Sequence, residues 1–259
     1  GNETTGNSGG ATFTTDTKLV MDGCSISNNK AEGFAGGAYF YVPAEQTMDV
    51  EVKNSHFDNN TATGNCGGVY VRDDSGTNNM KISFTNTTFN GNVGNMGGCL
   101  LVNNAKLAFK GCEFKGNKNN GNGIMYMYTT NTGGEIELTM DGCSYVENVP
   151  AEGASTGLIG GIYLYTNHTS HTIKAYITNS YFANNKANGR AAAIYMRNAK
   201  VDKTYLYVAN CTFANNKANG RAASLYMRNA KIDQINLYVA NCTFANNQAG
   251  SLGAAINLY

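Results

Sequence analysis

Residues 181–211 read YFANNKANGRAAAIYMRNAKVDKTYLYVANC, and residues 212–242 read TFANNKANGRAASLYMRNAKIDQINLYVANC. The two stretches are 31 residues long and differ at seven positions, most of them conservative. A unit that recurs without a gap is typical of stacked repeats, because each unit buries its apolar face against its neighbours. The repeat therefore predicts a solenoid.

The same frame occurs eight times along the chain. In each copy a small or polar residue precedes Cys, Ser or Thr, and an apolar, usually aromatic, residue is followed three positions later by Asn. The apolar position is held by Ile26, Phe57, Phe89, Phe114, Tyr145, Phe182, Phe213 and Phe244, and the Asn position by Asn29, Asn60, Asn92, Asn117, Asn148, Asn185, Asn216 and Asn247. Coils stacked about 4.8 Å apart would align these residues into ladders. The clearest ladder residues are Phe182, Phe213, Phe244, Asn185, Asn216 and Asn247.

Two further alternating segments accompany each aromatic position. Apolar pairs such as Leu206 and Val208 precede it, and a small pair followed by an alternating run comes after the Asn, as in GGAYFYV (36–42) and AAIYM (192–196). Such alternation predicts half-buried strands. Because Ala replaces Gly at the small pair, we expect this site to require small size rather than a positive φ.

Three short strands and three turns in about 31 residues make one coil of a parallel β-helix. We therefore predict an all-β, single-stranded parallel β-helix of about eight coils over residues 18–259. Residues 1–17 are expected to form an N-terminal tail or cap.

The charge is divided unequally along the chain, although the net charge is only +1. Residues 1–170 carry nine Lys/Arg against 16 Asp/Glu, a net −7, and residues 171–259 carry ten against two, a net +8. Such asymmetry can mark a surface for an acidic partner, and solvated turns in a recently duplicated block are the alternative.

The location expected from the sequence is extracellular. No apolar run approaches the ~20 residues that a membrane span needs, so no direct membrane span is expected. Glycosylation sequons favour a secreted protein. They lie at Asn2, Asn59, Asn86, Asn167, Asn210 and Asn241.

The seven cysteines permit two interpretations. Cys24, Cys112, Cys143, Cys211 and Cys242 share one position of the frame, where other copies have Ser or Thr. This interchange favours small, buried free thiols. Disulfides between coils are the alternative, since stacking brings Cys112 near Cys143, Cys211 near Cys242, and Cys66 near Cys99. No C-x-x-C occurs, so we expect neither a zinc site nor another metal or cofactor.

Catalysis is the third-ranked interpretation. A polysaccharide lyase or hydrolase needs clustered or paired carboxylates. Glu135 and Glu137 share the outward face of one strand, but we expect Lys174 and Tyr176 at the equivalent positions of the next coil. His56, His168 and His171 lack a nucleophile frame. We therefore expect no catalytic residues.

Tyrosines recur at outward strand positions. One column is expected to contain Tyr39, Tyr70, Tyr163, Tyr195 and Tyr226, and a second Tyr176, Tyr207 and Tyr238. Aromatic columns can serve as carbohydrate platforms or protein hot spots. The alternative is that Tyr simply suits an exposed strand.

Basic ladders lie in the same segments: Lys186/Lys217, Arg190/Arg221, Arg197/Arg228 and Lys200/Lys231. Like charges one coil apart repel by ~1 kcal/mol in water, a cost that an acidic ligand reverses. We therefore predict a partner-binding surface for an acidic protein domain, and extracellular character counts against nucleic acid. Its predicted residues are Arg190, Arg197, Arg221, Arg228, Tyr163, Tyr195, Tyr207, Tyr226 and Tyr238.

The signals GGAYF, GGVYV, FDNN and FANN resemble repeats of chlamydial polymorphic outer-membrane proteins, and similar repeats occur in secreted β-helix adhesins. The resemblance covers residues 18–259 and implies a right-handed β-helix. The Asn-, Lys- and Tyr-rich composition with sequons also resembles the large scaffoldins of anaerobic gut fungi, whose repeats bind enzyme-borne dockerins. The function so implied is a non-catalytic, scaffoldin- or cohesin-like extracellular module, with an adhesin or carbohydrate-binding β-helix as the alternative.

Overall fold

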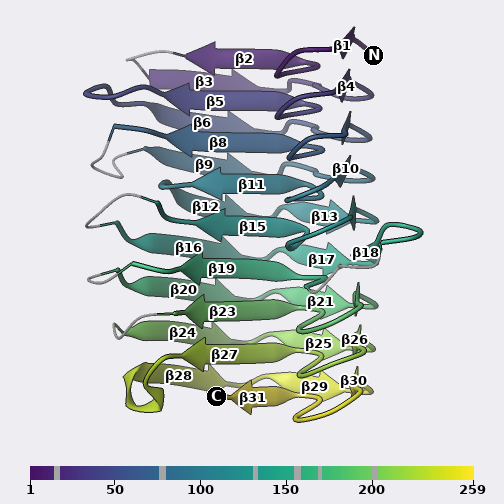
Figure 1. Ribbon diagram of the computed structural model, residues 1–259, viewed down its shortest axis with the longest axis vertical. Coiled ribbons are helices and arrows are strands. Elements are labelled where there is room, and N and C mark those ends of the chain that lie inside the picture. The colour runs from purple at the N-terminus through teal and green to yellow at the C-terminus, as the bar shows by residue number, and fades with distance from the viewer. Residues whose placement is uncertain (15–17, 76–79, 131–133, 155–158, 169–170, 200–202) are drawn as a thin grey trace.

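The chain winds into a stack of coils whose paired strands are all parallel (Figure 1). This computed structural model describes residues 1–14, 18–75, 80–130, 134–154, 159–168, 171–199 and 203–259. Within those ranges there is no α-helix, and the one helical turn is the 3₁₀ segment η1 (Ile232–Gln234). The predicted all-β parallel solenoid of about eight coils is confirmed.

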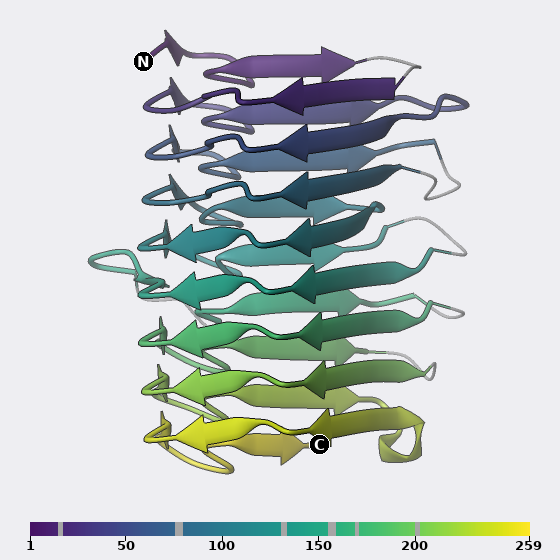
Figure 2. The same cartoon turned by 180° about the vertical axis from the view of Figure 1, so that it is seen from behind.

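Two long sheets form opposite faces of the stack (Figures 1 and 2). The front sheet of Figure 1 has nine strands: β2 (Ala11–Thr14), β5 (Ala38–Val42), β8 (Val69–Asp73), β11 (Leu100–Asn103), β15 (Met125–Tyr128), β19 (Ile162–Thr166), β23 (Ile194–Asn198), β27 (Leu225–Asn229) and β31 (Ile256–Leu258). The back sheet has eight: β3 (Lys18–Asp22), β6 (Asp49–Lys53), β9 (Lys81–Thr85), β12 (Lys106–Lys110), β16 (Ile136–Asp141), β20 (Ile173–Thr178), β24 (Thr204–Ala209) and β28 (Ile235–Ala240).

Shorter strands connect the two faces. Five aromatic strands continue the back face: β13 (Glu113–Lys115), β17 (Ser144–Val146), β21 (Tyr181–Ala183), β25 (Thr212–Ala214) and β29 (Thr243–Ala245). Two-residue side strands follow: β1 (Glu3–Thr4), β4 (Lys30–Ala31), β7 (Thr61–Ala62), β10 (Val93–Gly94), β14 (Lys118–Asn119), β18 (Val149–Pro150), β22 (Lys186–Ala187), β26 (Lys217–Ala218) and β30 (Gln248–Ala249). Residues 1–14 take part in the stack, since β1 pairs with β4 and β2 with β5.

The core lies between the two sheets and the aromatic strands. Alternate residues of each back strand point inward, so that Leu107 and Phe109 are buried while Ala108 and Lys110 are exposed. The aromatic positions stack along the axis, for example Phe182 on Phe213 with ring centroids 4.9 Å apart. The inward half of the strand pattern therefore forms one continuous apolar core.

An asparagine ladder runs beside this core. The Oδ1 of Asn216 accepts the backbone N–H of Asn185 at 3.1 Å and its side-chain amide at 2.9 Å. The amide of Asn185 also donates to the carbonyl of Tyr145 at 2.9 Å. Equivalent bonds join each neighbouring pair from Asn29 to Asn247, and Asn2 extends the ladder by donating to Asn29. The ladder holds the turns in register, because the side-chain oxygen of each Asn accepts the backbone N–H of the ladder Asn in the preceding coil.

Either Gly or Asn occupies the corner after each back strand, because the backbone there has a positive φ. Gly23 has a φ of 64° and Asn210 a φ of 54°. Glycine adopts this conformation freely, and Asn is the side chain that tolerates it best. The recurring Gly/Asn at the start of the frame is therefore a turn signal.

The glycine pairs before the front strands of the N-terminal coils are sterically required. A Cβ placed on Gly37 would lie 2.6 Å from the carbonyl oxygen of Gly68 in the next coil. In the last coils an extra residue enters here, since Arg190 pairs with Ile159 whereas Ile194 pairs with Ile162. That residue, Ala191, has a φ of 45° although it is not glycine. The extra residue makes a β-bulge.

Candidate functional site

The first tyrosine column is buried, so the expectation that it faces solvent is wrong. Its residues are in register on the outward side of the front sheet: Tyr39, Tyr70, Leu101, Tyr126, Tyr163, Tyr195 and Tyr226. Tyr195 is 1% exposed and Tyr226 0%. The turn segments before the front strands fold over the rings, and Ala35, Ile159 and Ala191 share one apolar cluster with them. Tyr163, Tyr195 and Tyr226 therefore offer almost no surface to a partner.

The buried rings stack on one another and lose contact with water. Centroids are 4.9 Å apart for Tyr163 and Tyr195 and 4.7 Å apart for Tyr195 and Tyr226. Burial raises the pKa of Tyr39 to about 12, and burial also raises the pKa of Tyr195. The hydroxyl of Tyr195 has no hydrogen-bond partner among the described residues. The tyrosine column forms a second apolar cluster between the front sheet and the turn segments that cover it.

A second column of outward residues lies beside the buried tyrosines on the front sheet, and in its C-terminal coils a tyrosine is followed by two arginines. Tyr165, Arg197 and Arg228 are successive register partners on β19, β23 and β27. The guanidinium of Arg197 lies over the Tyr165 ring at 5.2 Å, and that of Arg228 over the Tyr259 ring at 5.3 Å. Cation–π contacts of this kind hold a long side chain in place while its N–H groups remain available.

Arg190 and Arg221 extend the same surface toward the side strands. They occupy equivalent positions of adjacent coils, where the N–H of Ala191 donates to the carbonyl of Arg221 at 3.1 Å. Arg221 donates to the hydroxyl of Tyr226 at 3.3 Å and lies 4.8 Å from the Tyr259 ring centroid. We call Arg190, Arg197, Arg221 and Arg228 the basic face.

No carboxylate of the described residues neutralises the basic face. Among the described residues, none of its four arginines forms an ion pair. Lys186 and Lys217 are exposed register partners on β22 and β26 and add positive charge at the nearby edge. Lys231 is exposed, and Lys200 lies outside the described residues.

Tyr207 and Tyr238 are exposed, as predicted, but they do not adjoin the basic face. They lie on β24 and β28 of the back sheet, on the opposite side of the stack (Figure 2). Outward residues of two sheets that enclose one core must point in opposite directions. The two rings stack with centroids 4.7 Å apart and an interplanar angle of 2°. The structure therefore divides the predicted binding residues between two surfaces.

The back sheet also carries the carboxylates considered for catalysis. Glu137 pairs in register with Lys174, and Thr139 with Tyr176, so the expected alignment was wrong by two residues. β16 and β20 pair with the same 37-residue offset as Tyr145 and Phe182. The residues that lengthen this coil beyond 31 therefore lie outside these strands. The Nζ of Lys174 lies 2.6 Å from Glu135, and this contact lowers the pKa of that carboxyl. Lys106 lies 3.5 Å from both glutamates.

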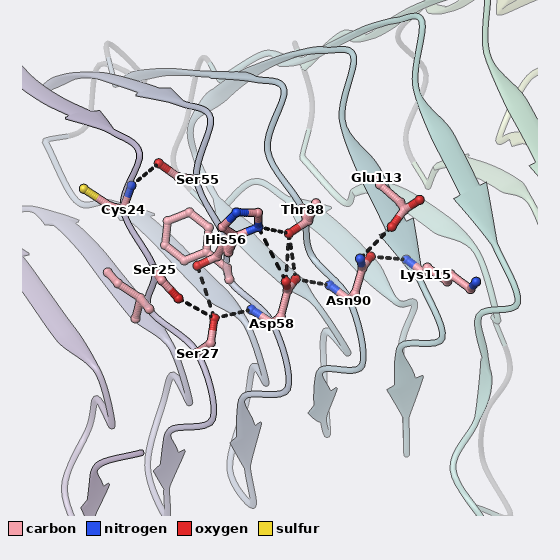
Figure 3. Close-up of polar contacts among 12 residues, drawn as sticks. Cys24, Ser25, Ser27, Ser55, His56, Asp58, Thr88, Asn90, Glu113 and Lys115 are labelled. Atoms are coloured by element: carbon pink, nitrogen blue, oxygen red, sulfur yellow. Dashed lines mark hydrogen bonds and ion pairs between the residues drawn. The ribbon is translucent and has the colours of Figure 1, made fainter.

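A polar cluster on the aromatic-strand face was not predicted (Figure 3). The hydroxyl of Thr88 donates to Asp58 at 2.8 Å and lies 2.8 Å from the Nδ1 of His56. Asn90 donates to Asp58 and Glu113, which carries the network to the next coil. The Nδ1 of His56 also lies 3.8 Å from Asp58, but the Thr88 hydroxyl lies between imidazole and carboxylate, whereas in a nucleophile–base–acid triad the imidazole lies in the middle. The only sequence signal is polar residues flanking the buried aromatic.

The remaining histidines and the cysteines are structural in their contacts. His171 is fully buried, and its Nδ1 lies 2.8 Å from the hydroxyl of Thr129 while its Nε2 accepts the N–H of Gly134 at 3.0 Å. All seven cysteines are free. Burial raises the pKa of Cys211 to about 11, and a hydrogen bond that the Cys143 thiol donates to Cys112, together with burial, raises the pKa of Cys143.

The described ranges contain neither a cluster of metal-binding side chains nor a membrane-spanning helix. No three His, Cys, Asp or Glu side chains there are arranged to hold a metal ion. No helix in the same ranges has the length and hydropathy of a membrane span. Comparison of the chain with protein-family models, curated proteins and solved structures finds no match in any of the three.

Proposed function

We propose that this chain is a non-catalytic extracellular protein-binding module, in which the basic face holds the acidic surface of a partner domain. A scaffoldin- or cohesin-like module that binds a dockerin is the form of this function that the sequence resemblance favours. The observation that carries the proposal is the pair of arginine ladders on adjacent coils, supported by tyrosine rings and without carboxylate partners in the described chain.

The chemistry of the arginines suits carboxylates. A guanidinium presents a planar set of donors that can bind a carboxylate with two hydrogen bonds. Arg197 and Arg228 are one coil apart, so their mutual repulsion of ~1 kcal/mol in water is relieved when a carboxylate lies between them. The tyrosine rings restrict the arginine side chains before binding, which reduces the entropy lost on association.

The body of the module supports a rigid display. The stacked tyrosines lie beside the column of Arg197 and Arg228 on the same side of the front sheet, and the phenylalanine and asparagine ladders fix the coils behind it. A partner that binds two coils therefore meets groups whose spacing is set by the strand separation of about 4.8 Å.

Two further observations support the remaining parts of the proposal. The sequon residues Asn86, Asn210 and Asn241 are exposed at corner turns. A glycan attached there would not disturb the core, which agrees with an extracellular location. Glu135 is paired with lysines, which leaves it poorly placed as a general acid or base.

The test is capture of secreted proteins from the source organism with the chain as bait. The variant Arg197→Glu/Arg228→Glu is compared with Lys30→Glu/Lys118→Glu, which changes charge equally at exposed side-strand positions. We expect a set of proteins that share one small acidic domain, lost with the arginine variant and retained by the lysine variant. Equal capture by both variants would contradict a role for the basic face.

A further inference from the structure

We infer that the outward face of the back sheet binds a neutral polysaccharide chain lying along the solenoid axis. This surface is opposite the basic face, so the inference does not depend on the proposed protein partner (Figures 1 and 2). It rests on the shape of the face, on its balance of charge, and on the hydrogen-bonding groups that line it.

A trough crosses the strands of the N-terminal coils. Its floor is formed by the small residues Ser83, Ala108 and Thr139, which are register partners on β9, β12 and β16. The larger Glu51 and Tyr176 occupy the same column at its two ends. The trough has a volume of about 530 Å³, and Lys81, Lys106 and Glu137 form its rim.

A second hollow lies on the C-terminal coils of the same sheet. This hollow has a volume of about 470 Å³ and is lined by the side chains of Tyr176, Tyr205, Tyr207, Asn236 and Tyr238. Tyr176 stands between the two hollows, because it is the register partner of Thr139 at the end of the trough and lines the second hollow. We call the two hollows together the track.

The track is electrically balanced, although the charge along the chain is divided unequally. Its two columns carry four lysines, Lys18, Lys81, Lys106 and Lys174, and three carboxylates, Asp49, Glu51 and Glu137. Glu135, which lies just before β16 and contacts Lys106 and Lys174, adds a fourth carboxylate. The third outward column of the sheet adds two lysines and two aspartates: Lys53 and Lys110, Asp22 and Asp141. Mixed signs oppose a polymer of uniform charge, because its charged groups meet repulsive as well as favourable side chains.

The same groups suit a ligand rich in hydroxyls. A hydroxyl both donates and accepts, so it can bind an ammonium on one side and a carboxylate on the other. Lys81 and Asp49 are register partners on the rim, and neither forms an ion pair with another described residue. The methyl groups of Ala108 and Thr139 and the 42%-exposed ring of Tyr176 offer apolar surface to the C–H face of a sugar.

The direction of the track also excludes an added peptide strand. The backbone N–H and C=O groups of its strands are already bonded to the coils on either side, and the track runs across these strands. β-augmentation requires a free edge. Each coil advances by about 4.8 Å, close to the length of one sugar unit in an extended chain.

The inference is tested by calorimetric titration with cellohexaose and xylohexaose, and with hexagalacturonate as the acidic comparator. We expect binding of a neutral hexamer that weakens at least tenfold in Ala108→Arg, which fills the floor of the trough at an exposed position. Tyr176→Ala should weaken it as well. Lys110→Ala, on the same strand as Ala108 but outside the track, should bind like the wild type.

Three results would overturn the inference: no binding of either neutral hexamer, stronger binding of hexagalacturonate, or unchanged affinity in both track variants. Thermal melting establishes that each variant is folded. Arg197→Glu/Arg228→Glu should leave saccharide affinity unchanged, so that loss of the protein partner and loss of the saccharide are distinguished.

Discussion

The side chain of Asn216 accepts two hydrogen bonds from Asn185, one from its backbone and one from its amide. Asn185 in turn accepts the backbone N–H and the amide of Asn148, both at 3.0 Å. All three residues are fully buried. A rung removed from this ladder therefore leaves polar groups of two neighbouring coils without partners.

Asn185→Ala should destabilise the stack by about 3 kcal/mol or more, because each buried group left unsatisfied costs about 1–3 kcal/mol. Urea unfolding followed by circular dichroism measures the effect. Asn219→Ala, at an exposed turn of the next repeat, is the control and should change stability by less than about 0.5 kcal/mol. Equal effects of the two changes would show that the ladder contributes little.

The two neighbouring tyrosines of the buried column should respond differently to loss of the hydroxyl. Tyr195→Phe removes a hydroxyl that has no partner among the described residues and should stabilise the protein by up to about 1 kcal/mol. Tyr226→Phe removes the 3.3 Å bond from Arg221 and should not stabilise it. Thermal melting of both variants tests this, and the reverse order would contradict the assignment of these contacts.

Two glycine-to-alanine changes separate steric from conformational requirements. Gly37→Ala places a methyl group 2.6 Å from the Gly68 carbonyl and should cost roughly 1–3 kcal/mol through overpacking. Gly23→Ala meets no atom within 4 Å but must adopt a φ of 64°, which should cost about 1 kcal/mol. Urea midpoints should therefore fall further for Gly37→Ala, and the opposite order would refute the steric explanation.

Stability should fall as the pH rises from about 10 to about 12. Tyr39 has a pKa raised to about 12 by burial, whereas an unfolded tyrosine ionises near pH 10. Between these values the unfolded chain has lost the proton that the native chain keeps, so ionisation favours unfolding. Tyr39→Phe should show a shallower decline over this range, measured by urea unfolding at several pH values. A parallel decline would exclude Tyr39 as a contributor.

Thiol labelling should follow burial. Cys24 and Cys242 are partly exposed, whereas Cys66, Cys99 and Cys211 are buried. Iodoacetamide reacts with the thiolate, and burial raises the pKa of Cys66 and Cys99 above the usual range. Peptide mapping should find Cys24 and Cys242 modified first in the native protein and all seven modified in urea. Rapid native labelling of Cys66 would contradict the burial described.

Much of the fold follows from sequence spacing alone. The 31-residue interval between Asn185, Asn216 and Asn247 places these residues at equivalent points of successive coils, and parallel pairing follows from it. Strand alternation is equally informative on the back sheet, where Leu206 and Val208 point inward and Tyr207 outward. Periodicity suffices here because each position repeats the same local environment.

The proposed binding surface was harder to predict, because the exposure of its side chains depends on how the turns cover each coil. Alternation places Tyr195 outside the core, but only the path of the preceding turn shows that the ring is buried. Sequence proximity groups Tyr207 with Arg197, whereas the two sheets put them on opposite faces. The ladder residue Asn2 was missed as well, because the frame is recognised by the apolar residue three positions before its Asn.

Because coils stack in the order of the chain, the division of charge along the sequence becomes a separation of charge in space. The rod is therefore an electric dipole whose positive end comprises the coils that carry the basic face. An acidic molecule approaching it would exert a torque that turns this end forward before any contact forms. Orientation in solution is thus built into the order of the repeats, and added salt, which screens the field, would make encounters less selective in direction.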